Sequence, residues 1–124
     1  MQILNISRDN IISGDAKAAR SFFSRLRGLM FSSPADMVLV SPREKISYSS
    51  IHMLFMRFPI DVLWLDSAMR VVDMARDVPP FDLRKPVTWR TYRPGRDARY
   101  VVEIAVNKLP AVEIGDVIKF DPPL

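Results

Sequence analysis

Alternating apolar and polar residues predict several short β-strands in this chain. The clearest alternation covers residues 98–106, where the even-numbered positions are apolar and Arg99 and Glu103 lie on the opposite face. Shorter apolar runs bounded by turn residues predict further strands. These runs cover residues 1–6, 10–18, 37–40, 51–58, 60–65, 70–75 and 117–120.

Two of these strands are expected to pair as a hairpin. Residues 60–65 and 70–75 flank a short polar turn at 66–69, the arrangement typical of antiparallel neighbours. Pro59 separates residues 60–65 from the preceding apolar run and has no N–H to donate to a sheet. We therefore expect a bend, a bulge or a sheet edge at Pro59.

One segment has the helical period instead. The apolar residues at positions 22, 23, 26, 29 and 30 fall on a single stripe. Ser21 is the expected N-cap, and Pro34 after two serines prevents continuation. The sequence therefore predicts one short helix near residues 21–30.

Together these elements indicate a mainly β fold, that is, a β-rich α+β protein. Several short strands, one short helix and ten prolines are typical of a small sandwich or a barrel-like arrangement of antiparallel sheets. The length of 124 residues suits a single domain over residues 1–124. Within it, residues 78–97 form a proline-rich basic loop that is too long for a tight connection.

Composition excludes several kinds of chemistry. The chain has no cysteine, so it has no disulfide, no thiolate metal site and no cysteine nucleophile. A single histidine excludes a multi-histidine metal centre, and no phosphate-binding, nucleophile-elbow or zinc-protease motif is present. We assign no catalytic residue, metal or cofactor, and expect a binding or accessory module rather than an enzyme.

Positive charge is concentrated in one segment. The whole chain carries a net charge of +4, whereas residues 84–100 alone carry +5 and the remainder −1. Arginine interleaved with aromatic residues can hold phosphates and stack on bases, so nucleic-acid binding through residues 84–99 is one alternative. A solvated loop whose aromatic residues pack on a sheet explains the same composition. The cationic residues are Arg84, Lys85, Arg90, Arg93, Arg96 and Arg99.

Four patches along the chain carry a family resemblance when they are taken in order. They are Arg25-Leu26-Arg27-Gly28-Leu29-Met30, Met37-Val38-Leu39-Val40, His52-Met53 through to Pro59-Ile60-Asp61-Val62-Leu63-Trp64-Leu65-Asp66, and Tyr100-Val101-Val102-Glu103-Ile104 with Gly115-Asp116. Together they resemble the family known as domain of unknown function 192. They span roughly residues 10–120, and the resemblance implies a compact, mainly β domain with one short helix but no particular activity. His52 and Phe55 stand where many members carry Trp and Asn.

Charged residues within apolar segments suggest a ligand site. We hypothesise a polar cleft near the bend at Pro59, with the basic loop as its rim and a small anionic or sugar-like molecule as its ligand. Each residue also has a structural interpretation: a helix-end charge, a core histidine, an ion-paired aspartate and a solvated glutamate. The hypothesised lining is Arg27, His52, Asp61 and Glu103.

A second hypothesis is enzymatic. If Asp61 and Glu103 converged, two carboxylates could shift each other's pKa and perform hydrolase-type acid–base chemistry. Paired acids are also common in structural ion networks, so we keep the binding module as the first interpretation.

The sequence shows no targeting or membrane-spanning segment. Its longest apolar stretch, residues 54–65, is interrupted by Arg57, Pro59 and Asp61 and is too short to span a bilayer. We therefore expect a cytoplasmic protein with no membrane partner, monomeric by default. A small-molecule ligand is the expected partner, with nucleic acid as the alternative.

Overall fold

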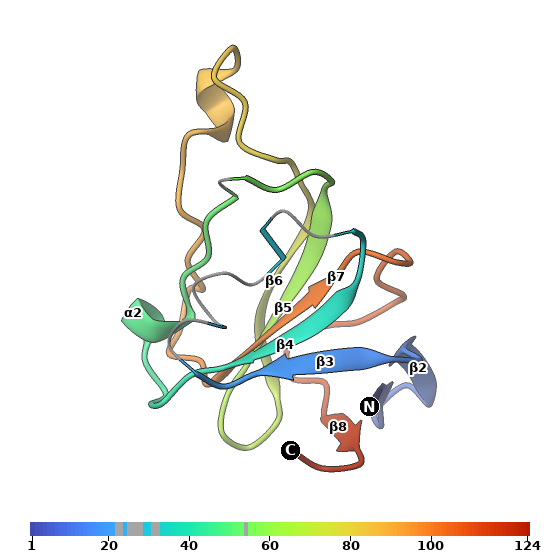
Figure 1. Ribbon diagram of the computed structural model, residues 1–124. Helices are drawn as coiled ribbons and strands as arrows, with labels where there is room; N and C mark the ends of the chain where they lie inside the picture. Colours follow the sequence, from blue (N-terminus) through green and yellow to red (C-terminus); the bar gives the residue numbers. More distant parts are fainter. Residues whose placement is uncertain (22–23, 25–28, 31–32, 54) are drawn as a thin grey trace.

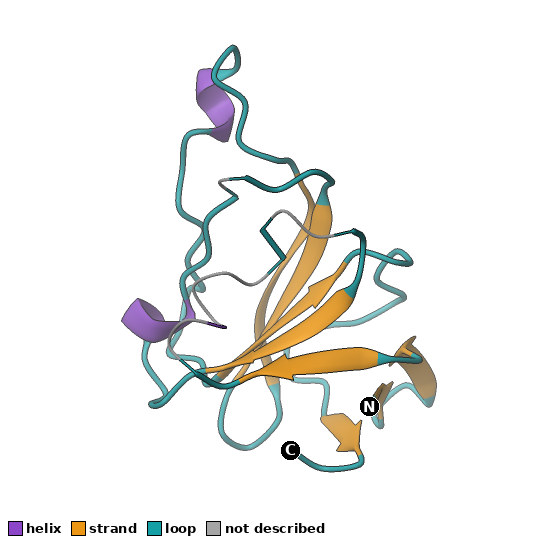
Figure 2. Ribbon diagram, in the orientation of Figure 1, coloured by secondary structure: helices purple, strands orange, loops and turns teal. Residues whose placement is uncertain are grey.

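A computed structural model describes residues 1–21, 24, 29–30, 33–53 and 55–124. Its strands form two sheets joined by long connections (Figures 1 and 2). The elements are β1 (Gln2–Asn5), β2 (Asn10–Ser13), β3 (Ala16–Ala19), β4 (Asp36–Val40), α2 (Ile46–Ser49), β5 (Ile60–Leu65), β6 (Val71–Val78), η1 (Pro86–Thr88), β7 (Tyr100–Ile104) and β8 (Ile118–Asp121).

The smaller sheet has three strands in the order β2-β1-β8, and the larger has five in the order β3-β4-β7-β5-β6. Every pairing between these strands is antiparallel except that of β3 with β4, which is parallel. Strand β7 is central in the larger sheet and pairs with β4 on one side and with β5 on the other. The expected mainly β class is confirmed, in the form of two open sheets.

One core lies between the two sheets, and we call it the inter-sheet core. Successive strand residues point to opposite faces, so alternate residues of β5 and β7 belong to different cores. Leu63, Leu65 and Val102 of the larger sheet pack with Ile3 and Phe120 of the smaller one. Each of these five side chains is buried.

A second core covers the other face of the larger sheet, and we call it the loop-side core. Val62 and Val101 contribute from β5 and β7, and they pack in one cluster with Ile51, Met53 and Tyr92 from the long connections. Ile51 and Tyr92 exchange backbone hydrogen bonds of 2.9 and 2.8 Å, which join two connections that are distant in sequence. Loop segments therefore supply the second layer on this face.

The expected hairpin forms, and it contains a bulge. Ile60 pairs with Val78 but Val62 pairs with Ala75, so β6 has one more residue than β5 between these positions. Asp77 in this interval has a φ of 52°, in the left-handed region that non-glycine residues seldom adopt. The bulge therefore needs local stabilisation.

Two predicted elements differ in the structure. Residues 51–58 do not form a strand, because Phe55 has a φ of 59° and the Met56 N–H donates to the Met53 carbonyl in a turn. The predicted helix near residues 21–30 falls mainly outside the described residues. At its start, the Ser24 N–H donates to the Ser21 hydroxyl at 3.0 Å, the bond expected of an N-cap.

Candidate functional site

The contacts of Asp61 indicate a structural role. It lies on β5 opposite Ile104 of β7 and is buried on the inter-sheet side. One carboxylate oxygen accepts the Asp77 N–H at 2.8 Å, and the other accepts the Leu109 N–H at 2.7 Å. Two backbone donors therefore compensate the buried charge, and in return Asp61 holds the β6 bulge and the connection after β7.

A second buried carboxylate, missed by the sequence analysis, acts in the same way. Asp36, the first residue of β4, accepts the backbone N–H groups of Ala105 and Val106 at 2.8 and 3.1 Å. Its other oxygen accepts the Ser13 hydroxyl at 2.6 Å. Asp36 and Asp61 thus hold opposite ends of residues 105–109. The only sequence signal was an acid directly before a buried apolar run.

A small pocket does lie at the predicted bend. Its volume is about 170 Å³, and its described lining includes Pro59, Asp61, Asp77 and the chain from Ile104 to Lys108. Neither His52 nor Glu103 is among these lining residues. Ligand pockets usually enclose about 300–1,000 Å³, and Asp61 already serves two backbone donors. This pocket is therefore smaller than the hypothesised cleft and differently lined.

Glu103 and Asp61 project from opposite faces of the larger sheet. Glu103 pairs with Val62, a member of the loop-side core. Asp61 is the residue next to Val62 on β5. Because a strand alternates its side chains, the β-sheet itself separates the two carboxylates. They do not form the shared acid–base pair that the hydrolase hypothesis requires.

Glu103 is the buried carboxylate without compensation in the described part of the chain. Its side chain lies between Met37 of β4 and Val62 of β5 and is 5% exposed, so the expectation of a solvated strand residue is wrong. No described residue donates a hydrogen bond to its carboxylate. Burial alone raises the pKa of Glu103 to about 7.

The structure says less about the other two hypothesised lining residues, His52 and Arg27. His52 lies between Ile51 and Met53, which are buried in the loop-side core, while His52 itself is only half-buried. Arg27 lies outside the described residues. Of the four residues, the structure therefore puts Asp61 on one side of the sheet and Glu103 on the other, with His52 in a segment that covers the Glu103 side.

The tip of the basic loop, residues 79–89, is held together by its own hydrogen bonds. The Thr88 hydroxyl accepts the Asp82 N–H at 2.8 Å and donates to the Lys85 carbonyl at 2.8 Å. The indole of Trp89 donates to the Asp82 carbonyl at 2.8 Å and stacks on Phe81 with ring centres 6.1 Å apart. We call residues 79–89 the loop tip; it projects beyond the sheets at the end of the molecule away from both termini (Figure 1).

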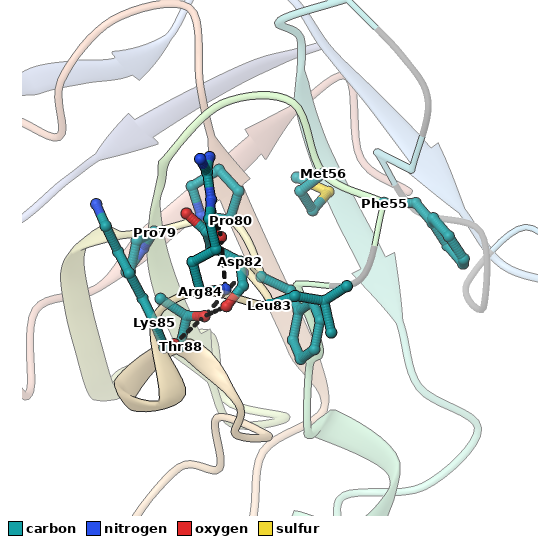
Figure 3. Close-up of a pocket in the computed structure, with 10 residues that line it drawn as sticks. Phe55, Met56, Pro79, Pro80, Asp82, Leu83, Arg84, Lys85 and Thr88 are labelled. Carbon is teal, nitrogen blue, oxygen red and sulfur yellow. Dashed lines mark hydrogen bonds and ion pairs between the residues drawn. The ribbon is translucent and has the colours of Figure 1, made fainter.

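A larger pocket lies between the loop tip and the residues Phe55 and Met56. Its volume is about 910 Å³, within the usual range for ligand sites. Figure 3 shows Arg84 and Lys85 on one side and Phe55 on the other, with Leu83 extending toward Phe55. The pocket therefore has a cationic side and an apolar side. Its described lining is Phe55, Met56, Pro79, Pro80, Phe81, Asp82, Leu83, Arg84, Lys85 and Thr88.

The carboxylate of Asp82 contacts both the backbone and the side chain of Arg84 in the loop tip. The Arg84 N–H donates to its carboxylate at 2.9 Å, and this backbone bond lowers the pKa of Asp82 below its ordinary value. The Arg84 guanidinium lies 3.6 Å from the same carboxylate, yet its side chain is 92% exposed. Arg84 therefore remains accessible to an incoming anion.

Two further cations of the basic segment make contacts within the protein. The Arg90 guanidinium lies 4.5 Å from the centre of the Tyr92 ring, and Tyr92 is buried. Arg99 donates to the Ser41 carbonyl and lies over Tyr100. The six cations of residues 84–99 are therefore not all directed outward.

The described residues contain no group of three His, Cys, Asp or Glu side chains placed to hold a metal ion. They also contain no helix that is long and apolar enough to cross a bilayer.

The fold and this site define a small two-sheet β protein with a pocketed, cationic loop tip. The chain belongs to the family DUF192, described as "Uncharacterized ACR, COG1430", whose profile matches residues 4–120. The resemblance drawn from the sequence patches is thereby confirmed.

Relatives and a solved structure agree with this assignment. The chain is 36% identical to the UPF0127 protein TK1120 of Thermococcus kodakarensis, over 97% of this chain and 73% of that protein. It is 35% identical to a UPF0127 protein of Pyrococcus furiosus, over 96% and 97% of the two chains. A protein of unknown function from Novosphingobium aromaticivorans has a similar structure, with a TM-score of 0.74, 16% identity, and coverage of 96% of this chain and 82% of the other. The last likeness concerns the fold alone.

The role of Asp61 can be tested by its removal. Asp61→Ala leaves the Asp77 and Leu109 N–H groups without their acceptor, so the free energy of unfolding should fall by about 3 kcal/mol. Urea unfolding at neutral pH measures this change. Asp15→Ala is the control, because the Asp15 side chain is 97% exposed, and should cost less than about 0.5 kcal/mol. Equal costs for the two variants would contradict the structural role.

The burial of Glu103 predicts a pH-dependent stability. The folded state holds the Glu103 proton up to about pH 7, whereas the ordinary pKa is 4.5, so stability is full below pH 4.5 and falls as pH rises toward 7. Glu103→Gln lacks this titration. The stability advantage of Glu103→Gln over the wild type should therefore grow by about 3 kcal/mol between acidic and mildly alkaline pH. Urea unfolding of both proteins across this range measures it, and parallel pH profiles would refute it.

Proposed function

We propose that this protein is a binding module whose site is the pocket that the loop tip forms with Phe55 and Met56. The ligand carries an anionic group beside an apolar part. One observation carries the proposal: a single pocket of ligand size combines the Arg84 and Lys85 side chains with a wall that includes Phe81 and Leu83.

The chemistry of the two sides supports this ligand class. A guanidinium and an ammonium group together favour a carboxylate or phosphate, and Arg can bind it with two parallel hydrogen bonds. The apolar wall gains from covering a hydrophobic group, because that removes apolar surface from water. Neither side alone accounts for the pocket, since its lining joins both.

Preorganisation supports the location. The Thr88 and Trp89 side chains already fix the backbone of Asp82, so a ligand does not have to order the loop tip on binding. Such prior ordering reduces the entropic cost of association. The proposed site differs from the hypothesised cleft at Pro59, whose pocket is about five times smaller.

Nucleic-acid binding through residues 84–99 is the second candidate. The net charge of +5 over residues 84–100 favours it, as does the half-exposed Trp89. Against it, Tyr92 is buried and Arg90 and Arg99 contact Tyr92, Tyr100 and the Ser41 carbonyl. The pocket needs none of these residues, so we place the ligand there.

Phenyl phosphate tests the proposed function, because it joins an apolar ring to an anion. Amide chemical shifts of the non-proline residues between 81 and 88 should respond to phenyl phosphate at lower concentration than to inorganic phosphate or benzyl alcohol. Arg84→Ala/Lys85→Ala should weaken phenyl phosphate binding by about tenfold, since each 1.4 kcal/mol of lost interaction is a factor of ten.

Arg43→Ala/Lys119→Ala is the matched control, because it removes two exposed positive charges outside the pocket lining. It should leave binding within about twofold of the wild type. Equal losses in the two double variants would show that net charge alone explains the binding, and shifts confined to residues outside the pocket lining would place the ligand elsewhere. Either result contradicts the proposed site.

A further inference from the structure

Large apolar side chains are exposed around the pocket as well as within it. Leu83 is 76% exposed, Val87 80%, Phe55 57% and Trp89 51%. Three of them belong to the loop tip, and Phe55 belongs to the turn that faces it across the pocket. Exposed apolar patches with a polar rim are typical of interaction sites.

This apolar surface extends beyond what a small molecule would cover. Leu83 and Phe55 line the pocket, but Val87 and Trp89 are outside its lining. A small ligand is usually enclosed by its pocket, whereas the exposed side chains of Val87 and Trp89 continue this surface along the loop tip. The occupant that matches it is longer than the pocket.

The charged residues around this surface indicate the sign of the charge that its occupant carries. The loop tip contains two cations, Arg84 and Lys85, which line the pocket, and one acid, Asp82. The Asp82 carboxylate already accepts a hydrogen bond from the Arg84 N–H, so it does not need a positively charged group from the occupant. An occupant with several acidic groups is therefore complementary.

We propose that the natural ligand of this pocket is an acidic segment of another polypeptide, which places an apolar side chain between Phe55 and Leu83 and its carboxylates at Arg84 and Lys85. This inference rests on the proposed function and specifies its ligand class. Alternation of acidic and apolar side chains along the segment matches the cationic and apolar sides of the pocket (Figure 3).

The apolar contacts favour a polypeptide over nucleic acid. Leu83 and Val87 are aliphatic, and they need an apolar partner rather than a base to stack on. The Trp89 ring already stacks on Phe81, and Tyr92 is buried, so these two rings are less available to bases. A peptide supplies both aliphatic groups and carboxylates.

A short synthetic peptide that alternates glutamate and leucine tests the inference by calorimetric titration of the whole chain. It should bind at least about tenfold more tightly than a glutamate–serine peptide, which lacks the apolar groups, or a lysine–leucine peptide, which reverses the charge. Single-stranded oligothymidylate and phenyl phosphate are titrated in parallel.

Two variants separate the peptide from a small ligand. Leu83→Ser/Val87→Ser should weaken the glutamate–leucine peptide about tenfold. Val87→Ser alone should also weaken the peptide but leave phenyl phosphate binding unchanged, because Val87 is outside the pocket lining. Val106→Ser/Ile114→Ser is the matched control, because these side chains are 58% and 62% exposed in other loops. It should leave peptide binding unchanged.

The outcomes are distinct. If phenyl phosphate binds but the glutamate–leucine peptide does not, this inference is overturned and the proposed function stands. If neither ligand binds, both the inference and the proposed function are overturned. Equal binding of the lysine–leucine peptide, or tighter binding of oligothymidylate, overturns the acidic-polypeptide assignment, and equal losses in the two serine double variants overturn its location.

Discussion

Two buried aspartates hold the central strand of this fold in place. Asp36 binds the backbone directly after β7, and Asp61 binds it again at Leu109. Each carboxylate accepts backbone N–H groups that would otherwise be buried without partners, so its own burial is compensated. Because β7 pairs with both β4 and β5, these bonds fix where β7 ends relative to its neighbours. The register of the larger sheet, and with it both cores, depends on that position.

The same register explains why two buried acids have different consequences. Asp61 meets two N–H groups where a bulge and a connection bring backbone to its face. Glu103 projects to the other face, between Met37 and Val62, where complete strands surround it and their N–H groups are used in the sheet. Burial is similar for the two, and at Glu103 it raises the pKa to about 7. The two acids therefore differ in the donors available to them and not in their depth.

Sequence patterns could predict the strands but not these partners. The hairpin of β5 and β6 and the alternation in β7 follow from local periodicity, and they are present. The relation of Asp61 to Glu103 depends on the pairing of Val62 with Glu103, which are distant in sequence, and periodicity does not encode that pairing. Residues 51–58 form an apolar run that predicts a strand, yet the left-handed backbone of Phe55 ends the extended conformation. The order within the loop tip likewise depends on side-chain bonds to backbone, from Thr88 and Trp89, in a segment whose composition is typical of any solvated loop.

The arrangement separates the scaffold from the proposed site. The loop tip closes on itself through Asp82, Thr88 and Trp89, and it joins the body through the bond from the Phe81 N–H to the Met53 carbonyl. Arg84, Lys85 and Leu83 take no part in either core. Changing them alters charge and apolar surface without removing a buried contact, so their effect on binding can be measured free of an effect on folding. A site built in this way can vary in ligand while the two sheets and their aspartate bonds stay the same.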